Sequence, residues 1–333
     1  LHRVLLAYLP GVCLALAIAL GASLIAPVLQ WPAALIVLVC GFALGRLRRP
    51  SALEPGLLLA KHGLLKIGIV LLGANISLVS ILQIAPSMLA AVPGLVVLTI
   101  FIGCLTARAI GAPSSFGYLA GGAVAICGAS AALAIYLGLP ASKRNEGQLA
   151  LSIFGVTVLS TVAMIAYPVV LSLLGFDDRT IGLVLGASIH DVAQVVGAGL
   201  SVSDDAGELA ILVKMVRVLC LPIVVIMAGI MFHDTTSNFT KSHIGIPWFI
   251  VGFFIAVVTN ATGLISPFLA PYLKYMSTIL LLTAIGALAM QIELSDDVGL
   301  FSIEWIIFCV PTFLLFAISI AAVRILRISI FPV

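Results

Sequence analysis

Residues 4–27 read VLLAYLPGVCLALAIALGASLIAP, a run of 24 residues without a charged side chain. A helix needs about 20 apolar residues to cross a hydrocarbon core of about 30 Å, so this run is long enough to span a bilayer. A cleaved signal peptide would also begin with an apolar stretch, but of only about 7–15 residues. We therefore expect a retained membrane helix.

The composition of the whole chain agrees with this interpretation. Soluble domains are about 45–50% apolar and about 25% charged, whereas this chain of 333 residues is 62% apolar and 9% charged, with a mean hydropathy of +1.30. The longest polar stretch, His233 to Gly245, spans only thirteen residues. We therefore predict one integral membrane domain over residues 1–333.

Ten or eleven such segments follow one another along the chain, which predicts an all-α, polytopic membrane helix bundle. The second segment is short, and the fifth and seventh are interrupted by clustered glycine, small and polar residues. The expected segments are 4–27, 33–45, 57–81, 87–109, 114–138, 147–174, 180–200, 209–231, 246–265, 272–291 and 301–325.

Charge and cysteine usage exclude several classes of protein. The formal charge of +3 comes from Lys and Arg scattered at segment ends, without the basic stripe of a nucleic-acid-binding surface. All six cysteines lie inside apolar runs without the spacing of a metal site or a disulfide framework. We expect no metal, no cofactor and no nucleic acid. The cysteines are Cys13, Cys40, Cys104, Cys127, Cys220 and Cys309.

Two signals disagree on the number of spans. Cytoplasmic loops carry the excess of Lys and Arg; eleven spans divide the basic residues seven to five, whereas a fifth segment that dips in and returns divides them ten to two, with only Arg179 and Lys241 outside. Against this, residues 68–78 resemble residues 284–294, and an inverted repeat of the kind common in transporters requires eleven spans. We favour eleven spans slightly and leave ten open.

The first unusual stretch is GGAVAICGASAA at residues 121–132, in which glycine and small residues lie within a membrane segment. Such residues either let two helices pack closely or let the backbone unwind. A break would leave backbone N–H groups near Cys127, Gly128 and Ser130 free to bind an anion, because the N-terminus of a half-helix is partly positive.

The second stretch is GASIHDVAQVVGAG at residues 186–199, which contains an imidazole, a carboxylate and an amide. Ionisable residues within a membrane segment are costly, about 2.5–3.5 kcal/mol for Asp at the centre, and are functional candidates by default. At 100° per residue His190 and Asp191 point to different sides of a helix, so we expect them to have different partners, whereas Gln194 shares the face of Asp191.

Lys214 and Arg217 form one basic face on an otherwise apolar helix. Their side chains either extend to the membrane interface, as long basic residues often do, or need a counter-charge within the bundle. Asp191 is the nearest acidic candidate along the chain, and an anionic substrate is the other. Lys61, His62 and Lys66 we assign to the interface.

These motifs together resemble the YeiH-like sulfate exporter family of bacterial inner-membrane proteins. The resemblance covers nearly the whole length and rests on ICGASA at 126–131, IHDVAQVV at 189–196 and KMVRV at 214–218. It implies a multi-pass protein of the bacterial plasma membrane. It also implies a distant similarity to the cation/proton antiporter and bile-acid symporter class, which is built from inverted repeats with broken helices.

The hypothesis that follows is a secondary transporter of a small anionic solute, with sulfate or a related sulfur oxyanion implied by the resemblance alone. No GxxxxGK[ST] loop is present to bind ATP, so an ion or proton gradient must supply the energy. We expect no catalytic activity, a lipid bilayer and a small anion as partners, and compatibility with a homo-oligomer. A passive channel is an alternative.

The hypothesis gives each candidate residue a role. Lys214 and Arg217 balance the anion, and the backbone near Cys127, Gly128 and Ser130 contacts it. The coupling residues are His190, Asp191 and Gln194, because a His with an unperturbed pKa of about 6.5 is suited to carry a proton.

An intramembrane hydrolase using Ser130 or Cys127 with His190 and Asp191 is a weaker alternative. The carboxylate of a triad must orient the imidazole, and adjacent residues on one helix point apart. The chain also lacks a GxSxG elbow.

Overall fold

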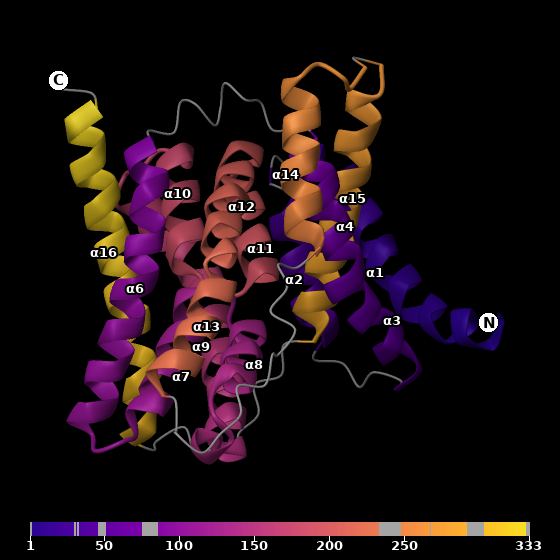
Figure 1. Cartoon of the computed structure of the whole chain (residues 1–333). Coiled ribbons are helices and arrows are strands. Elements are labelled where there is room, and N and C mark those ends of the chain that lie inside the picture. The colour runs from indigo at the N-terminus through magenta and orange to yellow at the C-terminus, as the bar shows by residue number, and fades with distance from the viewer. Residues whose placement is uncertain are drawn as a thin grey trace. The chain divides into compact units, whose positions relative to one another are not determined.

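The computed structural model describes residues 2–29, 31, 33–45, 51–74, 86–232, 248–266, 268–291 and 303–330, and every regular element in them is helical (Figure 1). Apolar runs form helices because a helix satisfies its backbone hydrogen bonds within itself, as a bilayer requires. The α-helices are α1 (His2–Leu29), α2 (Ala33–Gly45), α3 (Glu54–Leu59), α4 (Leu65–Gly73), α6 (Pro86–Ala109), α7 (Ser114–Ala125), α8 (Ala129–Gly138), α9 (Glu146–Leu173), α10 (Asp178–Ser188), α11 (Val192–Val202), α12 (Asp204–Leu219), α13 (Leu221–Met231), α14 (Trp248–Ala261), α15 (Ala270–Met290) and α16 (Ile306–Ile330).

Four shorter helical elements complete the list. Three are 3-10 turns and one is a π-helix that joins α3 to α4. They are η1 (Ser51–Leu53), η2 (Ala60–Leu64), η3 (Ala141–Lys143) and η4 (Ile303–Trp305).

Within the described residues, seven helices are long and apolar enough to cross a membrane, and four apolar helices are shorter. All eleven lie within or overlap the segments expected from the sequence, which confirms the all-α, multi-span fold. The long helices are Ala7–Leu29, Ser51–Gly73, Ala91–Ala109, Glu146–Leu173, Asp204–Met231, Ala270–Met290 and Ile303–Ile325. The shorter ones are α2, α8, α11 and α14.

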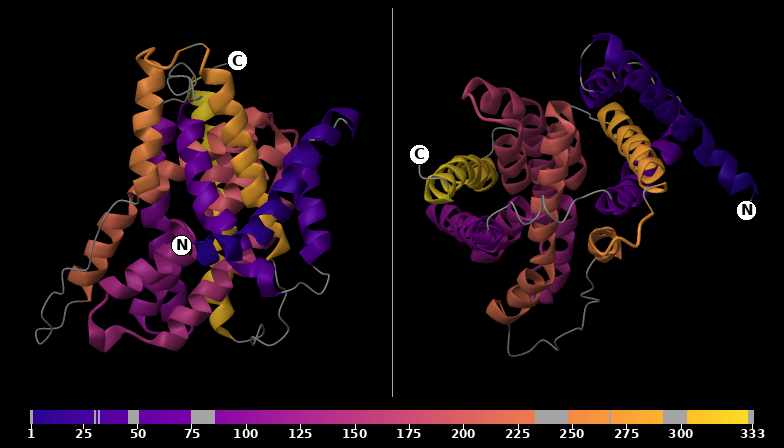
Figure 2. Two further views of the ribbon diagram at one scale, coloured as in Figure 1. Left: turned by 90° about the vertical axis from the view of Figure 1, so that its right-hand side faces the viewer. Right: turned by 90° about the horizontal axis from the view of Figure 1, so that it is seen from above.

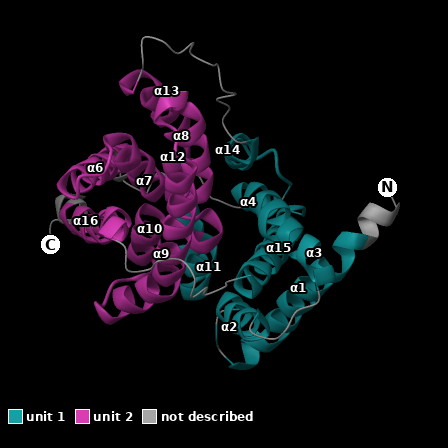
Figure 3. Cartoon of the chain, turned by 90° about the horizontal axis from the view of Figure 1, so that it is seen from below, with its two compact units in different colours: residues 1–84, 196–211, 247–294 teal, residues 85–195, 212–246, 295–333 magenta. Residues whose placement is uncertain are grey.

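The chain forms two compact units that are interleaved along the sequence (Figure 3). Unit 1 comprises residues 1–84, 196–211 and 247–294, and unit 2 comprises residues 85–195, 212–246 and 295–333. Because the chain passes from one unit to the other several times, neither unit is a continuous segment. The expected single domain over residues 1–333 stays a prediction.

Unit 1 is held together by close approach of helix backbones. Helix α15 packs against α1, α2 and α4, and the views of Figure 2 show α1 beside α15. A Cβ atom on Gly11 of α1 would lie 2.1 Å from the carbonyl oxygen of Leu53, and one on Gly41 of α2 would lie 2.8 Å from Cβ of Ala289. Small residues at these positions allow the van der Waals packing that drives helix association in lipid.

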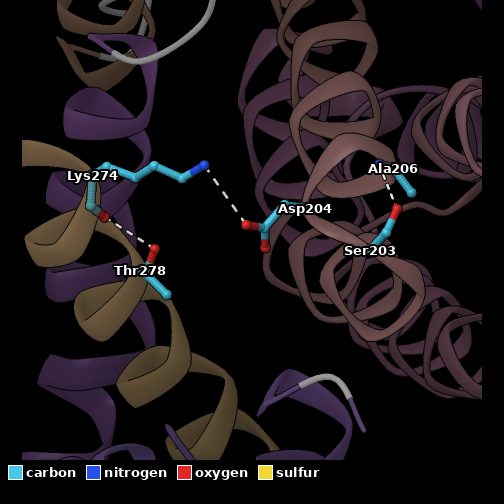
Figure 4. Close-up of polar contacts among 5 residues, drawn as sticks. All are labelled: Ser203, Asp204, Ala206, Lys274 and Thr278. Carbon is cyan, nitrogen blue, oxygen red and sulfur yellow. Dashed lines mark hydrogen bonds and ion pairs between the residues drawn. The ribbon is translucent and has the colours of Figure 1, made fainter. Parts of the chain in front are cut away.

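An exposed ion pair also belongs to unit 1 (Figure 4). Nζ of Lys274 on α15 lies 3.7 Å from Oδ2 of Asp204 at the start of α12, with side chains 52% and 71% exposed. Ser203 caps the same helix end, since its Oγ accepts from the Ala206 N–H at 3.2 Å. Exposed pairs contribute about 0–1 kcal/mol, so the cap and the acidic first turn define this helix start more than the ion pair does.

Unit 2 contains the eight candidate site residues predicted from the sequence, and several of its helices pack against α7. Helices α6 and α16 pack against α7, and a Cβ on Gly121 would lie 3.0 Å from Cα of Ile100 on α6. The Tyr118 hydroxyl donates to the Val224 carbonyl at 2.8 Å and so links α7 to α13. Helix α9 begins at a side-chain cap, where Asn145 Oδ1 accepts from the Gln148 N–H at 3.0 Å.

Some predictions fall outside the described residues. Among them are the loop bases Arg46, Arg48, Arg49 and Lys241, and the ends of the compared segments at 75–78 and 292–294. The membrane orientation, the choice between ten and eleven spans and the inverted repeat therefore stay predictions.

Candidate functional site

Two membrane segments of unit 2 are interrupted where the sequence predicted. Helix α7 ends at Ala125 and α8 begins at Ala129, while α10 ends at Ser188 and α11 begins at Val192. Gly128 has φ +66° and ψ −127°, a conformation that residues with a Cβ rarely adopt. In stretch 121–132 both interpretations therefore hold, since Gly121 packs closely against α6 and Gly128 lies in a break.

The two breaks lie against each other. A Cβ on Gly128 would lie 3.9 Å from the backbone nitrogen of Asp191. We call residues 126–128 and 189–191, with the helix ends that flank them, the crossing. Four half-helices therefore end or begin around one small volume, with α7 and α10 contributing C-termini and α8 and α11 contributing N-termini.

Lys214 on α12 is fully buried and binds both breaks. Its Nζ donates to the carbonyl oxygens of Ile126, Ile189 and His190, the second at 2.8 Å. These carbonyls lie at the C-terminal ends of α7 and α10, where the helix macrodipole is negative and a cation is favourable. The ammonium thus holds the two interrupted helices together.

Arg217, one helical turn further along α12, is 1% exposed and binds the same two helix ends. Towards α7, Nε donates to the Ala125 carbonyl at 2.7 Å and Nη2 to the Val124 carbonyl at 2.9 Å. Towards α10, Nη1 donates to the carbonyls of Gly186 at 3.1 Å and Ile189 at 2.8 Å. The planar guanidinium presents several donors in a fixed fork, which suits this set of carbonyls.

Burial of both cations corrects one expectation from the sequence. Side chains that extend to the membrane interface would be exposed, whereas Lys214 and Arg217 are not, so the snorkelling alternative is wrong for them. Asp191 is close enough to act electrostatically on Lys214. No carboxylate of the described residues forms an ion pair with either cation, and their hydrogen bonds go to backbone carbonyls. Their contact with an anion stays a prediction.

Asp191 occupies the N-terminus of α11. Its Oδ1 accepts from the N–H groups of Ala193 at 2.8 Å and Gln194 at 3.3 Å, which is the geometry of an N-cap. Its own N–H donates to Oγ of Ser160 on α9 at 3.1 Å. Asp191 is half-buried, whereas His190, Lys214 and Arg217 are buried.

His190 and Asp191 have different partners, as expected, but the reason differs from the prediction, because both lie in the break between α10 and α11 and not on one helix. The imidazole is fully buried, with Nε2 at 2.9 Å from Oγ1 of Thr312 on α16. Its Nδ1 is buried and has no hydrogen-bond partner among the described residues. The carboxylate therefore does not orient the imidazole through a hydrogen bond, which removes the main geometric requirement of a catalytic triad.

Gln194 lies one turn into α11 and is 2% exposed. Its Nε2 donates to Oγ1 of Thr161 on α9 at 2.9 Å. Its Oε1 is buried and has no hydrogen-bond partner among the described residues. Since buried polar atoms are nearly always paired, this amide is a candidate for contact with a bound solute or water.

The N-terminus of α8 differs from that of α11 because no side chain caps it. Gly128 supplies no cap, Ala129 is half-buried and Ser130 is exposed. Cys127 is buried beside Ser130 and Lys214. Lys214 and Arg217 thus bind the carbonyls at the ends of α7 and α10, whereas the N-terminus of α8 has no side-chain cap. The expectation of a free N–H at Gly128 is wrong, because this N–H donates to the Ala123 carbonyl at 2.9 Å.

Sequence reasoning missed three hydroxyl residues of this site, namely Ser160 and Thr161 on α9 and Thr312 on α16. Their signal is weak, because a Ser or Thr within a helix commonly bonds the carbonyl four residues earlier. Thr161 does this too, donating to the Thr157 carbonyl at 2.8 Å. Nothing in the local pattern separates it from the other hydroxyls of the membrane helices.

The arrangement is suited to hold negative charge. Two helix N-termini and two buried cations lie around the crossing, and no group of three or more His, Cys, Asp or Glu side chains in the described ranges could hold a metal ion. All eight residues singled out from the sequence lie in or beside the crossing. They are Cys127, Gly128, Ser130, His190, Asp191, Gln194, Lys214 and Arg217.

Comparison with known proteins finds bacterial membrane proteins that are similar over most of the chain. The family described as Conserved hypothetical protein 698 matches residues 9–298. The UPF0324 membrane protein TauZ of Paracoccus denitrificans is 37% identical over 289 residues, covering 86% of each chain. A UPF0324 membrane protein of Chlorobaculum tepidum is 37% identical over 302 residues, covering 90% of this chain and 83% of that one. The UPF0324 inner membrane protein YeiH of Escherichia coli K12 is 30% identical over 307 residues, covering 88% and 87%. No solved structure matches the chain significantly.

Proposed function

Because the chain belongs to the UPF0324 family of multi-pass inner-membrane proteins, we propose that it is a secondary transporter for a small anionic solute. Its relatives confirm the resemblance to the YeiH-like family that the sequence motifs indicated. Their names describe membrane proteins without a transport activity, so the proposal of transport rests on the geometry of the crossing.

The observation that carries the proposal is the pair of buried cations at the meeting point of two interrupted helices. Interrupted helices are typical of transporters, in which half-helix N-termini face anionic substrates and C-terminal carbonyls face cations. In this chain Lys214 and Arg217 already bind the C-terminal carbonyls. That leaves the N-terminal ends as the place where a solute of negative charge is favoured.

Of the two N-terminal ends, that of α8 is the better candidate for the solute. Asp191 fills the end of α11 with its own carboxylate, whereas Gly128 leaves the end of α8 uncapped beside the exposed Ser130. We assign solute contact to the backbone from Cys127 to Ser130, apart from the Gly128 N–H, which is bonded to the Ala123 carbonyl. Lys214 and Arg217 balance the charge of the solute. His190, Asp191 and Gln194 are the coupling residues.

The solute class is taken from the resemblance, which suggests sulfate or a related sulfur oxyanion. An ion or proton gradient drives transport in this proposal, since the chain contains no P-loop. A passive channel would share the same charge arrangement and would differ by uncoupled flux. We assign the chain no catalytic activity, because His190 and Asp191 bond to different partners.

The test is uptake of radiolabelled sulfate and thiosulfate into proteoliposomes, with and without an imposed pH gradient. The matched variants are Ser130→Asp and Ser130→Asn, which differ in charge and little in size. Ser130 is exposed and lies in the first turn of α8, where a carboxylate favours the helix. Ser130→Asp should therefore fold but block uptake, and Ser130→Asn should transport.

Three results would contradict parts of the proposal. Equal uptake by both Ser130 variants would move the solute away from α8. Flux that ignores the gradient would favour the channel. No uptake of any sulfur oxyanion would remove this solute class.

A further inference from the structure

In the interior of unit 2, positively charged side chains outnumber acidic ones among the described residues. Lys214 and Arg217 are fully buried, while Asp191 is half-buried and is the one acidic residue of this unit's described part that is not exposed. The acidic residues compared are Glu146, Asp177, Asp178, Asp191 and Glu304. The crossing therefore carries two positive charges against one negative charge.

Hydrogen bonds to carbonyls do not cancel this excess. The carbonyls that surround Lys214 and Arg217 solvate the two cations, but each dipole is neutral and leaves the net charge unchanged. A net charge away from water is costly unless an opposite charge accompanies it. When Asp191 is ionised, a bound anion with one negative charge makes the crossing electrically neutral. When Asp191 is protonated, a bound anion with two negative charges does so.

We propose that Asp191 takes up one proton when a divalent oxyanion binds the crossing, and stays ionised when a monovalent anion binds. This inference rests on the proposed anion-transport function and adds its proton stoichiometry. The proton comes from a hydronium ion or a buffer acid in the water on the side from which the anion enters. One O–H or N–H bond of that donor breaks, and one O–H bond forms at the carboxylate. The reverse transfer to water or buffer base takes place when the dianion leaves.

The geometry of Asp191 suits this exchange. Oδ1 holds the N–H groups of Ala193 and Gln194, so a proton on the other oxygen leaves the cap intact, because a protonated carboxyl keeps an accepting oxygen. Asp191 is half-buried, so its side chain is not fully enclosed by the protein. His190 is less suited, since it is fully buried against Thr312.

The charged and titratable groups around Asp191 come from three elements. Helix α9 contacts Asp191 through the hydroxyl of Ser160, and the hydroxyls of Thr161 and Thr312 bond to the neighbouring Gln194 and His190. The same two helices also carry the titratable side chains of Tyr167 and Cys309. The titratable groups are His190 beside it, Cys127 of the other break, and Lys214 and Arg217 of α12. Of these, His190 is the alternative site for the proton, because it is the neighbour of Asp191 in the same break.

The experiment is isothermal titration calorimetry of the purified full chain in detergent with sodium sulfate and with sodium methanesulfonate. Each titration is run at one pH in two buffers of different ionisation enthalpy, which gives the number of protons bound with the anion. We expect one proton per sulfate and none per methanesulfonate. Because one proton binds with each sulfate, the affinity for sulfate should fall about tenfold for each unit by which the pH rises, over the pH range in which the proton is taken up.

Two variants assign the proton. Asp191→Asn keeps an N-cap of equal quality and should bind sulfate without proton uptake or pH dependence. Asp178→Asn removes the same charge from an exposed position in the same unit and should behave like the unmodified chain.

Each other outcome overturns the inference. Sulfate binding without proton uptake in the unmodified chain would refute the inference and leave anion transport standing. Uptake that persists in Asp191→Asn but vanishes in His190→Gln would move the proton to the imidazole. Failure of both anions to bind, together with absent flux in proteoliposomes, would refute the proposed function as well.

Discussion

Replacing Lys214 with Met should destabilise the protein strongly, and the structure gives the magnitude. The ammonium binds three carbonyls, of which Ile189 keeps a second donor in Arg217 at 2.8 Å, whereas Ile126 and His190 lose the donor described for them. A buried acceptor left without a partner costs about 1–3 kcal/mol, so the two together cost about 2–6 kcal/mol. The cost of placing an ammonium in the bilayer is present in folded and unfolded inserted chains, so it largely cancels.

The assay is unfolding in mixed micelles of increasing dodecyl sulfate content, followed by far-ultraviolet circular dichroism and tryptophan fluorescence. Lys143→Met is the matched control, because this side chain is exposed and exposed substitutions change stability by about 0.5 kcal/mol or less. A loss below about 1 kcal/mol for Lys214→Met would refute the reasoning. It would mean that water or neighbouring donors satisfy both carbonyls as well as the ammonium does.

Three further substitutions test single contacts in the same assay. Asp191→Asn should keep the stability of the unmodified chain, while Asp191→Ala should lose about 0.5–2 kcal/mol with its cap. Gly128→Ala should cost about 1–3 kcal/mol because of the positive φ, whereas Gly21→Ala, with open space around its Cβ position, should be neutral or slightly stabilising. Thr312→Val should leave Nε2 of His190 buried without its hydroxyl partner and cost about 1–3 kcal/mol, and Thr312→Ser should restore it.

The fold was accessible from the sequence because membrane helices are encoded locally. Twenty or so apolar residues in a row allow few structures in lipid, so each expected segment coincides with helices. The interruptions were accessible for a related reason, since Gly128 and the polar residues His190 and Asp191 disfavour a continuous apolar helix. These properties need no knowledge of which helices pack together.

The roles of the charged residues were not accessible in the same way. A basic pair three residues apart gives the face of a helix but not what that face meets. Whether Lys214 reaches water, a carboxylate or carbonyls depends on how α7 and α10 pack against α12, and that packing is set by residues far away along the chain. The hydroxyls of Ser160 and Thr312 were missed because only tertiary contacts distinguish them from hydroxyls that bond their own helix.

The two breaks share a common plan and differ at one informative position. Ile126 and Ile189 are 63 residues apart, and the carbonyl of each accepts a hydrogen bond from Nζ of Lys214. Gly128 and Asp191, again 63 residues apart, each precede the first residue of a half-helix. At α11 the chain places its own carboxylate on the helix N-terminus, and at α8 it places a residue without a side chain.

That difference constrains the solute. The oxygen of Asp191 accepts from two successive backbone N–H groups, and the N–H groups at the start of α8 offer the same kind of donor. A solute that binds there must present an oxygen of comparable charge and size, without the chain that tethers Asp191. Under the proposed function, oxyanions such as sulfate meet this requirement, whereas the helix end and the net positive charge of the crossing disfavour cations. The carboxylate at α11 is thus the chain's own example of the ligand that we expect at α8.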